Sequence, residues 1–435
     1  MGQIAVRGEA VAETCRAADY GLRPAFHRSI RPIKRKGGKS QLLLHDHAGR
    51  QTTDKSDEAM AIKQCLAIRG RGELMAFSEL VERARVRSRD FDYELECEAV
   101  VGIVDTRRRA AVCHADKAHG PGGLPSKPFR AAPSEMTRLT DPVAVEDTLT
   151  GEVPLGWQGG DNTMLLKSAI KGLQCLTNQR SILLADCNPK IVGGEIRGRM
   201  SVALAPHISS TQWGDGFGAR SCELAHLGME ACSAVAYANS QSLIRLFIDV
   251  VQAFPSIVAS LSIPLPSRDV ATATLLTDLG FSLADVDDIV RSGVGAAEWA
   301  STSSHMKRVL AAFQEDQWVA QDFSGGVMAA SVGCSAGVPL AGVIAVVALS
   351  GITRRIHVAL EALGIGIHLS TAEAHSDLDP GSLLVSEPAP RVTNFGIVDD
   401  DVYVHACTAA EVPERLQTIA STVFNEYRRA GLELH

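Results

Sequence analysis

The spacing of apolar and polar residues predicts a chain that mixes helices and strands. Within residues 56–100, apolar side chains recur every three or four positions, which predicts amphipathic helices packed as an N-terminal helical segment. Short apolar runs at 181–186 and 242–250 predict strands. Between them, residues 221–241 predict a helix that Ser221 caps.

The second half of the chain continues this alternation. Helices are predicted over 275–292 and 305–314, and from about Pro339 to Leu363, where proline takes a permitted first-turn position. Residues 392–406, VTNFGIVDDDVYVHA, form two β-rich runs separated by acidic residues, which predicts a hairpin with carboxylates at its tip. By contrast, Pro and Gly interrupt residues 114–165, so turns are expected to dominate there, as either a linker or loops between short elements.

Composition bounds the architecture. With 435 residues, of which 46% are apolar and 21% charged, the chain can form two or three lobes with a substantial core, and global disorder is excluded. Residues 1–130 carry 24 Lys and Arg against 17 Asp and Glu, whereas residues 131–435 carry 19 against 33. Residues 1–55 are basic and poorly periodic, which predicts a flexible arm that is either a disordered tail or a nucleic-acid contact.

Cysteine usage and the first residues indicate the compartment. The ten cysteines include no CxxC pair, which favours reduced intracellular thiols over disulfides. Arg7, Glu9 and Glu13 interrupt any apolar stretch of a signal peptide. We therefore expect an intracellular protein, nuclear or cytoplasmic, that is not secreted.

One segment raises the question of a membrane. Residues 325–353 contain no charge and are followed by Arg354 and Arg355, so their length and flanks suit a bilayer span. Pro339 and the Gly/Ser-rich first half divide the segment into a loop and a helix that is apolar on all sides, which is typical of a buried central helix. No membrane partner is expected, although a membrane or interaction protein organised around this segment stays an alternative.

Acidic residues at strand ends are the candidate chemistry. Asp249 closes the run LFID, and Asp399, Asp400 and Asp401 occupy the turn of the predicted hairpin. Carboxylates held on neighbouring strands are the hard oxygen ligands that Mg²⁺ prefers, and two such ions can activate a 3′-hydroxyl and stabilise a leaving pyrophosphate. Considered alone, an acidic hairpin tip also fits a solvated turn.

The order of motifs resembles the reverse transcriptase domain of non-LTR (LINE-like) retrotransposons. FIDVVQAFPSIV is similar to the first palm motif, GCSAGVPLAGVI to the Gly-X-X-Gln-Gly-Asp-Pro-Leu turn before a long helix, and Ile397-Val398-Asp399-Asp400 to the Tyr-X-Asp-Asp hairpin. FNEYRRAGLELH is similar to the fourth motif. Upstream, GPGGLP, GWQGGDNTMLLK, RSILLADCNPKIVGGEIRGRM and QWGDGFGARSCELAHL resemble the family's fingers segments in the same order, so the resemblance covers about residues 42–435.

This resemblance implies an α+β right-hand polymerase. Its parts would be a basic arm (1–55), a helical segment (56–110), fingers (111–240) and a palm (241–435), with the reverse transcriptase domain over about 110–435 and the thumb absent or incomplete. An antiparallel palm sheet would carry Asp249 beside the Asp399 hairpin, backed by the helix after Pro339. The implied activity is that of an RNA-directed DNA polymerase, which synthesises DNA from dNTPs on an RNA or DNA template-primer with two Mg²⁺ ions, or Mn²⁺ in their place.

The resemblance also implies roles for individual residues. Asp249, Asp399 and Asp400 would be the catalytic metal ligands. Phe254 would lie under the sugar of the incoming nucleotide and exclude a 2′-hydroxyl. The fingers cations on the triphosphate would be Lys167 and Arg180, and Arg suits bidentate phosphate contact. The turn at the nucleotide would contain Gly337 and Pro339, and nucleic-acid contacts would come from Lys190, Arg197 and Gln212.

The chain departs from the family pattern at several positions. Ile397 stands where an aromatic residue is usual, Pro255 replaces an Asp, and Ala336 and Val338 replace the Gln and Asp of the second motif. These changes, together with the end of the chain at His435 where the family's thumb would begin, predict a divergent, truncated copy of retrotransposon origin. A catalytically dead nucleic-acid-binding remnant is the main alternative. Asp399-Asp400 is the preferred hairpin pair because it keeps an apolar residue at the aromatic position, and Asp400-Asp401 stays open.

Overall fold

We describe the protein from a computed structural model of the whole chain. Phe254, Pro339, Asp399 and most of the predicted basic arm lie outside the described residues. The described residues are 44–46, 48–69, 72–86, 94–167, 175–209, 211–213, 222–250, 263, 269–278, 281–292, 298–321, 326–330, 337–338, 340–369, 391–397, 400–430, 432 and 434.

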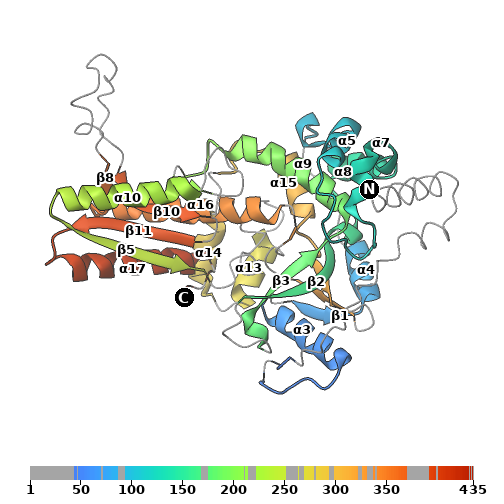
Figure 1. Cartoon of the computed structure of the whole chain (residues 1–435), viewed down its shortest axis with the longest axis horizontal. Coiled ribbons are helices and arrows are strands. Elements are labelled where there is room, and N and C mark those ends of the chain that lie inside the picture. The colour runs from blue at the N-terminus through green and yellow to red at the C-terminus, as the bar shows by residue number, and fades with distance from the viewer. Residues whose placement is uncertain are drawn as a thin grey trace, which may run out of the picture. The chain divides into compact units, whose positions relative to one another are not determined.

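The chain divides into two compact units, each built from several segments (Figure 1). Residues 198–240, predicted as part of the fingers, group with the second unit, and residues 308–331 group with the first. Unit 1 comprises residues 1–197, 308–331 and 335–340, and unit 2 comprises residues 198–307, 332–334 and 341–435.

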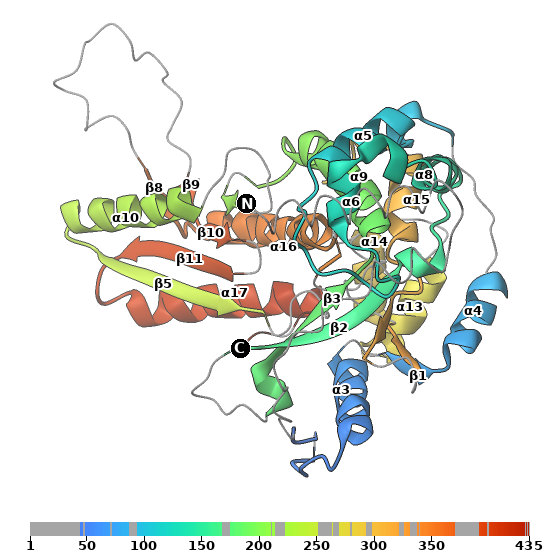
Figure 2. The same cartoon turned by 45° about the vertical axis from the view of Figure 1, so that its right-hand side comes forward.

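Unit 1 contains a five-stranded sheet whose strands come from distant parts of the chain. Helix α3 packs beside it (Figure 2). Ile62 and Leu66 of this helix belong to a core shared with Leu183 and Met328. The sheet order is β1 (Glu73–Met75), β7 (Val327–Ala329), β6 (Trp318–Ala320), β2 (Gly159–Leu166) and β3 (Gln179–Leu184), and α3 spans Lys55–Arg69 and α4 Phe77–Val86. The apolar periodicity of α3 is thus explained by packing on this sheet.

Unit 2 is built on a four-stranded sheet with helices on both faces. Strand β5, which ends at Asp249, pairs antiparallel with β11, the second strand of the predicted hairpin. This is the neighbouring arrangement that the sequence predicts. The sheet order is β4 (Gln212–Trp213), β10 (Asn394–Ile397), β11 (Asp400–Cys407) and β5 (Ser242–Asp249), and a separate pair joins β8 (Ile367–His368) to β9 (Arg391–Val392).

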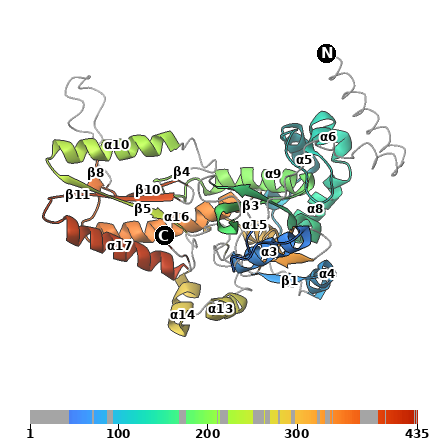
Figure 3. The same cartoon turned by 60° about the horizontal axis from the view of Figure 1, so that its bottom comes forward.

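The two faces of this sheet have different covers. Met229 and Cys232 of α10 pack on Phe395, Val402 and Val404. On the opposite face, α16 and α17 lie side by side (Figure 3) and form a core with β5 and β11. The helices are α10 (Cys222–Ala238), α13 (Asp269–Asp278), α14 (Leu283–Ser292), α16 (Ala341–Ala362) and α17 (Val412–Arg429).

Helix α16 is the apolar segment that raised the membrane question. It has 22 residues and is the one helix in the described part of the chain that is long and apolar enough to cross a membrane, and 72% of its most apolar window is buried. Ala345, Leu349 and Ile356 belong to the core under the sheet. A central core helix is apolar on all sides for this reason, so the composition of α16 is accounted for by its packing.

Unit 1 also contains a helical layer at residues 126–150, so this part of the Pro/Gly-rich stretch consists of short helices joined by turns and is not a linker. Helix α7 starts at Pro133 and α8 has Pro142 in its first turn, where proline costs no hydrogen bond. Gly151, at φ 62°, terminates α8. The helices are α5 (Ile103–Ala111), α6 (Ser126–Ala131), α7 (Pro133–Met136), α8 (Thr140–Thr150), α9 (Cys187–Leu204) and α15 (Ser304–Ala312), the last two crossing the unit boundary.

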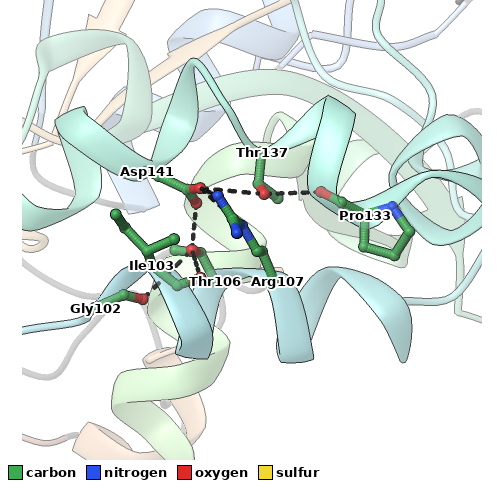
Figure 4. Close-up of polar contacts among 7 residues, drawn as sticks. All are labelled: Gly102, Ile103, Thr106, Arg107, Pro133, Thr137 and Asp141. Atoms are coloured by element: carbon green, nitrogen blue, oxygen red, sulfur yellow. Dashed lines mark hydrogen bonds and ion pairs between the residues drawn. The ribbon is translucent and has the colours of Figure 1, made fainter.

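A buried carboxylate ties this layer together. The side chain of Asp141, in α8, accepts hydrogen bonds from the hydroxyls of Thr106 and Thr137 and from Arg107 Nη2 at 3.2 Å (Figure 4). Asp141 is only 2% exposed. Because a buried charge needs partners, these contacts hold α5 against α8, and Asp141 has a structural role.

Candidate active site

The carboxylates of Asp249 and Asp400 come from neighbouring strands of unit 2. Asp400 lies directly opposite Asp249 in the register of β11 and β5, and both side chains are exposed. Residues directly opposite on antiparallel strands have Cβ atoms about 5 Å apart and point to the same face. Two carboxylates are therefore presented together at one end of the sheet.

The next residue of the hairpin points the other way. Asp401 is 4% exposed, and its carboxylate accepts a hydrogen bond from the hydroxyl of Tyr427 in α17. Successive residues of a strand face opposite sides of a sheet, so Asp401 cannot join Asp249 on the exposed face. Asp401 is thus excluded from the exposed pair, Asp399 lies outside the described residues, and Asp400 belongs to both candidate hairpin pairs. The bond from Tyr427 was not foreseen, because it depends on how α17 packs.

Glycine at position 396 is explained by the same buried cluster. Gly396 lies opposite Asp401 in the hairpin, and a Cβ atom there would clash with Asp401 Oδ1 and Gln212 Oε1. Tyr403 is also fully buried beside Asp401, and burial, followed by the charge of Asp401, raises the pKa of both Tyr403 and Tyr427 well above the usual value. Both phenols are therefore neutral, and Tyr427 can donate to the carboxylate.

The exposed pair fits a divalent cation in its chemistry. Like charges directly opposite on a sheet destabilise it, and a cation bound between them would offset that repulsion. Carboxylate oxygens suit Mg²⁺, which takes one or two protein carboxylates and completes its shell with water or phosphate oxygens. Within the described ranges, no three His, Cys, Asp or Glu side chains form a metal-binding group. The pair would thus supply two ligands, and Asp399 lies outside these ranges.

Two of the predicted phosphate-binding cations lie at one end of the β2–β3 hairpin in unit 1. Arg180 is opposite Leu165, and the N–H of Lys167 donates to the carbonyl of Asn178 at 2.9 Å. Lys167 is two residues beyond Leu165, so it shares the face of Arg180, about 7–8 Å away on the diagonal. Both side chains are exposed. They can contact one polyphosphate together.

Gly337 packs against the same hairpin. Its φ of +109° lies in the region that favours glycine, and a Cβ atom there would clash with the carbonyl oxygen of Leu183 in β3. The predicted turn residue therefore lies against the strand that carries Arg180. Close backbone approach explains why no side chain is tolerated at this position.

The three residues predicted to contact nucleic acid differ in exposure. Lys190 is half-buried in α9, its Nζ donates to the carbonyl of Ala118 at 3.3 Å, and burial lowers its pKa. Arg197 is half-buried in the same helix. Gln212 in β4 is only 1% exposed, because it lies under Gly396 in the sheet interior. A side chain this buried does not fit the predicted contact of Gln212 with nucleic acid. Its position in the sheet interior instead indicates a structural role.

No protein-family model matches the chain, and no curated protein is significantly similar to it. The function proposed below therefore depends on the arrangement of Asp249 and Asp400 in unit 2 and of Lys167 and Arg180 in unit 1.

Proposed function

We propose that the chain is a reverse transcriptase-like nucleotidyltransferase that extends a primer with dNTPs on an RNA or DNA template. The single observation that carries this proposal is the register of Asp249 with Asp400, which presents two carboxylates from a strand end and a neighbouring hairpin. The helix behind the sheet, α16, follows the segment that resembles the second palm motif. The order of motifs in the sequence supports the same function.

In this function, the side chains of unit 2 bind the reacting end of the primer. Asp249 and Asp400 would hold Mg²⁺, which when bound lowers the pKa of the attacking 3′-hydroxyl and neutralises the leaving pyrophosphate. The buried bond from Tyr427 to Asp401 anchors the hairpin below them. Because the anchor lies on the opposite face, it fixes Asp400 without occupying the space in front of it.

The exposed cations of unit 1 would bind the triphosphate. Arg180 presents a planar guanidinium that forms paired hydrogen bonds with phosphate oxygens, and Lys167 adds a second positive charge. A polyphosphate with charges spread over its oxygens needs this kind of positioning more than it needs acid–base catalysis. The shared face of the two side chains on β2–β3 supports this role.

A catalytically dead nucleic-acid-binding protein is the second candidate. It is favoured by Pro255, Ala336 and Val338, which replace polar residues of the family's motifs. Both candidates predict binding of template-primer, and only the first predicts synthesis. The distinction is therefore experimental.

The test is extension of a labelled primer on RNA and DNA templates with dNTPs and Mg²⁺. We expect wild type to extend the primer and Asp249→Asn to lose at least about 100-fold in rate, a loss of about 2.7 kcal/mol in transition-state stabilisation. Glu414→Gln, which removes an exposed carboxylate of α17, is the matched control and keeps the wild-type rate. No extension by wild type, with template-primer still bound, would instead support the dead remnant.

A further inference from the structure

One aromatic side chain on the face of the unit 2 sheet that α10 covers is largely exposed. Phe247, in the middle of β5, is 66% exposed. It lies two residues before Asp249 and therefore on the same face of the sheet. Its partner in the register is Val402, just as Asp400 is the partner of Asp249.

Helix α10 buries the neighbours of Phe247 on the sheet but does not bury Phe247 itself. Val402 and Phe395 share its face and are 8% and 3% exposed, because Met229 and Cys232 of α10 pack on them. Arg245 lies two residues before Phe247 in β5, further from the carboxylates, and its side chain donates to the carbonyl of Met229 in α10 at 3.2 Å. Phe247 belongs to none of the buried clusters formed by the described residues. The ring thus remains in solvent beside an apolar row.

The distance from this ring to the carboxylates limits what can bind there. Two residues along a strand span about 6–7 Å, so a ligand on the ring reaches the acidic pair within one nucleotide's length. A flat, apolar surface beside a cation-binding pair suits a molecule with a planar ring at one end and oxygens at the other. Nucleobases stack on aromatic side chains in this way. An apolar side chain of a partner protein would instead bring two carboxylates out of water without compensation.

We propose that Phe247 stacks on the base of the primer's 3′-terminal nucleotide and positions its hydroxyl at Asp249 and Asp400. This inference rests on the proposed function. Phe247 is then a positioning residue, and the base identity matters little because every base has a π face. The stack accounts for an aromatic ring that is 66% exposed beside the acidic pair.

The experiment compares primers that differ only at the 3′ end. One ends in a normal nucleotide and the other in an abasic residue, and their affinities on a common template are measured by fluorescence anisotropy with Ca²⁺ in place of Mg²⁺. For the normal primer, we expect Phe247→Ala to weaken binding about 5- to 100-fold and Phe247→Trp to retain it. For the abasic primer, wild type and Phe247→Ala should differ by less than about twofold, since no base is left to stack.

Three results would overturn this inference: equal loss of affinity for both primers, no loss for either, or no binding of the normal primer by wild type. Because the assay needs no turnover, it separates the two proposals. If wild type fails to extend primers but shows the predicted difference between termini, catalysis is excluded while base stacking stands. Equal melting temperatures of wild type and Phe247→Ala verify folding.

Discussion

Two consecutive aspartates of strand β11 in unit 2 lie on opposite faces of the sheet and differ in exposure. Asp400 is exposed opposite Asp249, whereas Asp401 is buried and accepts a hydrogen bond from Tyr427. Two like charges opposite each other destabilise a sheet, whereas a well-partnered carboxylate at the buried position anchors α17 to the hairpin. The difference separates a pair available for chemistry from a residue that stabilises the fold.

The largest expected effect tests the exposed side of this comparison. Asp400→Asn should lower the rate of primer extension by at least about 100-fold, or about 2.7 kcal/mol, because it removes one ligand of the acidic pair. Its free energy of unfolding should stay within about 0.5 kcal/mol of wild type, or rise, as for other exposed substitutions. Steady-state extension assays and urea unfolding measure the two quantities. A large loss of stability with normal extension would reverse the roles of the two faces.

The buried side is tested by Tyr427→Phe, which removes the hydroxyl that donates to Asp401. The free energy of unfolding should fall by about 1–3 kcal/mol, because a buried carboxylate loses a partner. Urea unfolding monitored by circular dichroism measures it. A change below about 0.5 kcal/mol would show that the bond does not anchor the hairpin.

The exposed cations of unit 1, Lys167 and Arg180, extend the comparison to groups of the opposite charge. Arg180→Gln should raise the KM for dNTPs about tenfold, and Arg180→Lys should recover part of the loss, because Lys lacks the paired donors. Arg130→Gln, an exposed arginine on α6, is the control and should leave the KM unchanged. Equal effects of Arg180→Gln and Arg130→Gln would point to general attraction by positive charge.

The smallest expected effect concerns Asp147, a buried carboxyl that, unlike Asp401, receives no hydrogen bond from a tyrosine in the described part of the chain. Oδ2 of Asp147 is buried without a hydrogen-bond partner among the described residues, and burial, followed by Glu146 and Glu152, raises the pKa of Asp147 to about 8. The folded protein therefore keeps a proton that the unfolded chain releases above about pH 4. This contribution to stability is complete below the unfolded pKa and is lost as the pH rises through 8.

Asp147→Asn removes this titration. Between pH 6.5 and 7.5, wild type should lose stability relative to the variant by on the order of 1 kcal/mol. Urea unfolding at both pH values provides the measurement. Parallel pH dependences of wild type and variant would mean that Asp147 ionises normally in the folded state.

Local patterns predicted the elements of unit 2 better than those of unit 1. Strand β5, helices α10 and α16 and the hairpin follow from periodicity, because their apolar faces pack on one sheet. Strands β1 and β7 have three residues each and pair Glu73 with Ala329, so neighbouring sequence holds no signal for them. In the site, the acidic residue types were visible in the sequence. The register that aligns Asp400 with Asp249, the burial of Gln212 and the exposure of Phe247 depend on tertiary packing.

Divalent metal binding at the acidic pair is the most direct test of the central claim. Mn²⁺ binding to the complex with primer, template and dNTP can be followed by electron paramagnetic resonance in wild type, Asp249→Asn, Asp400→Asn and the control Glu414→Gln. The proposed site predicts protein-bound Mn²⁺ in wild type and the control, and at least about tenfold weaker binding in both Asp variants. Equal Mn²⁺ affinity in all four proteins would contradict it.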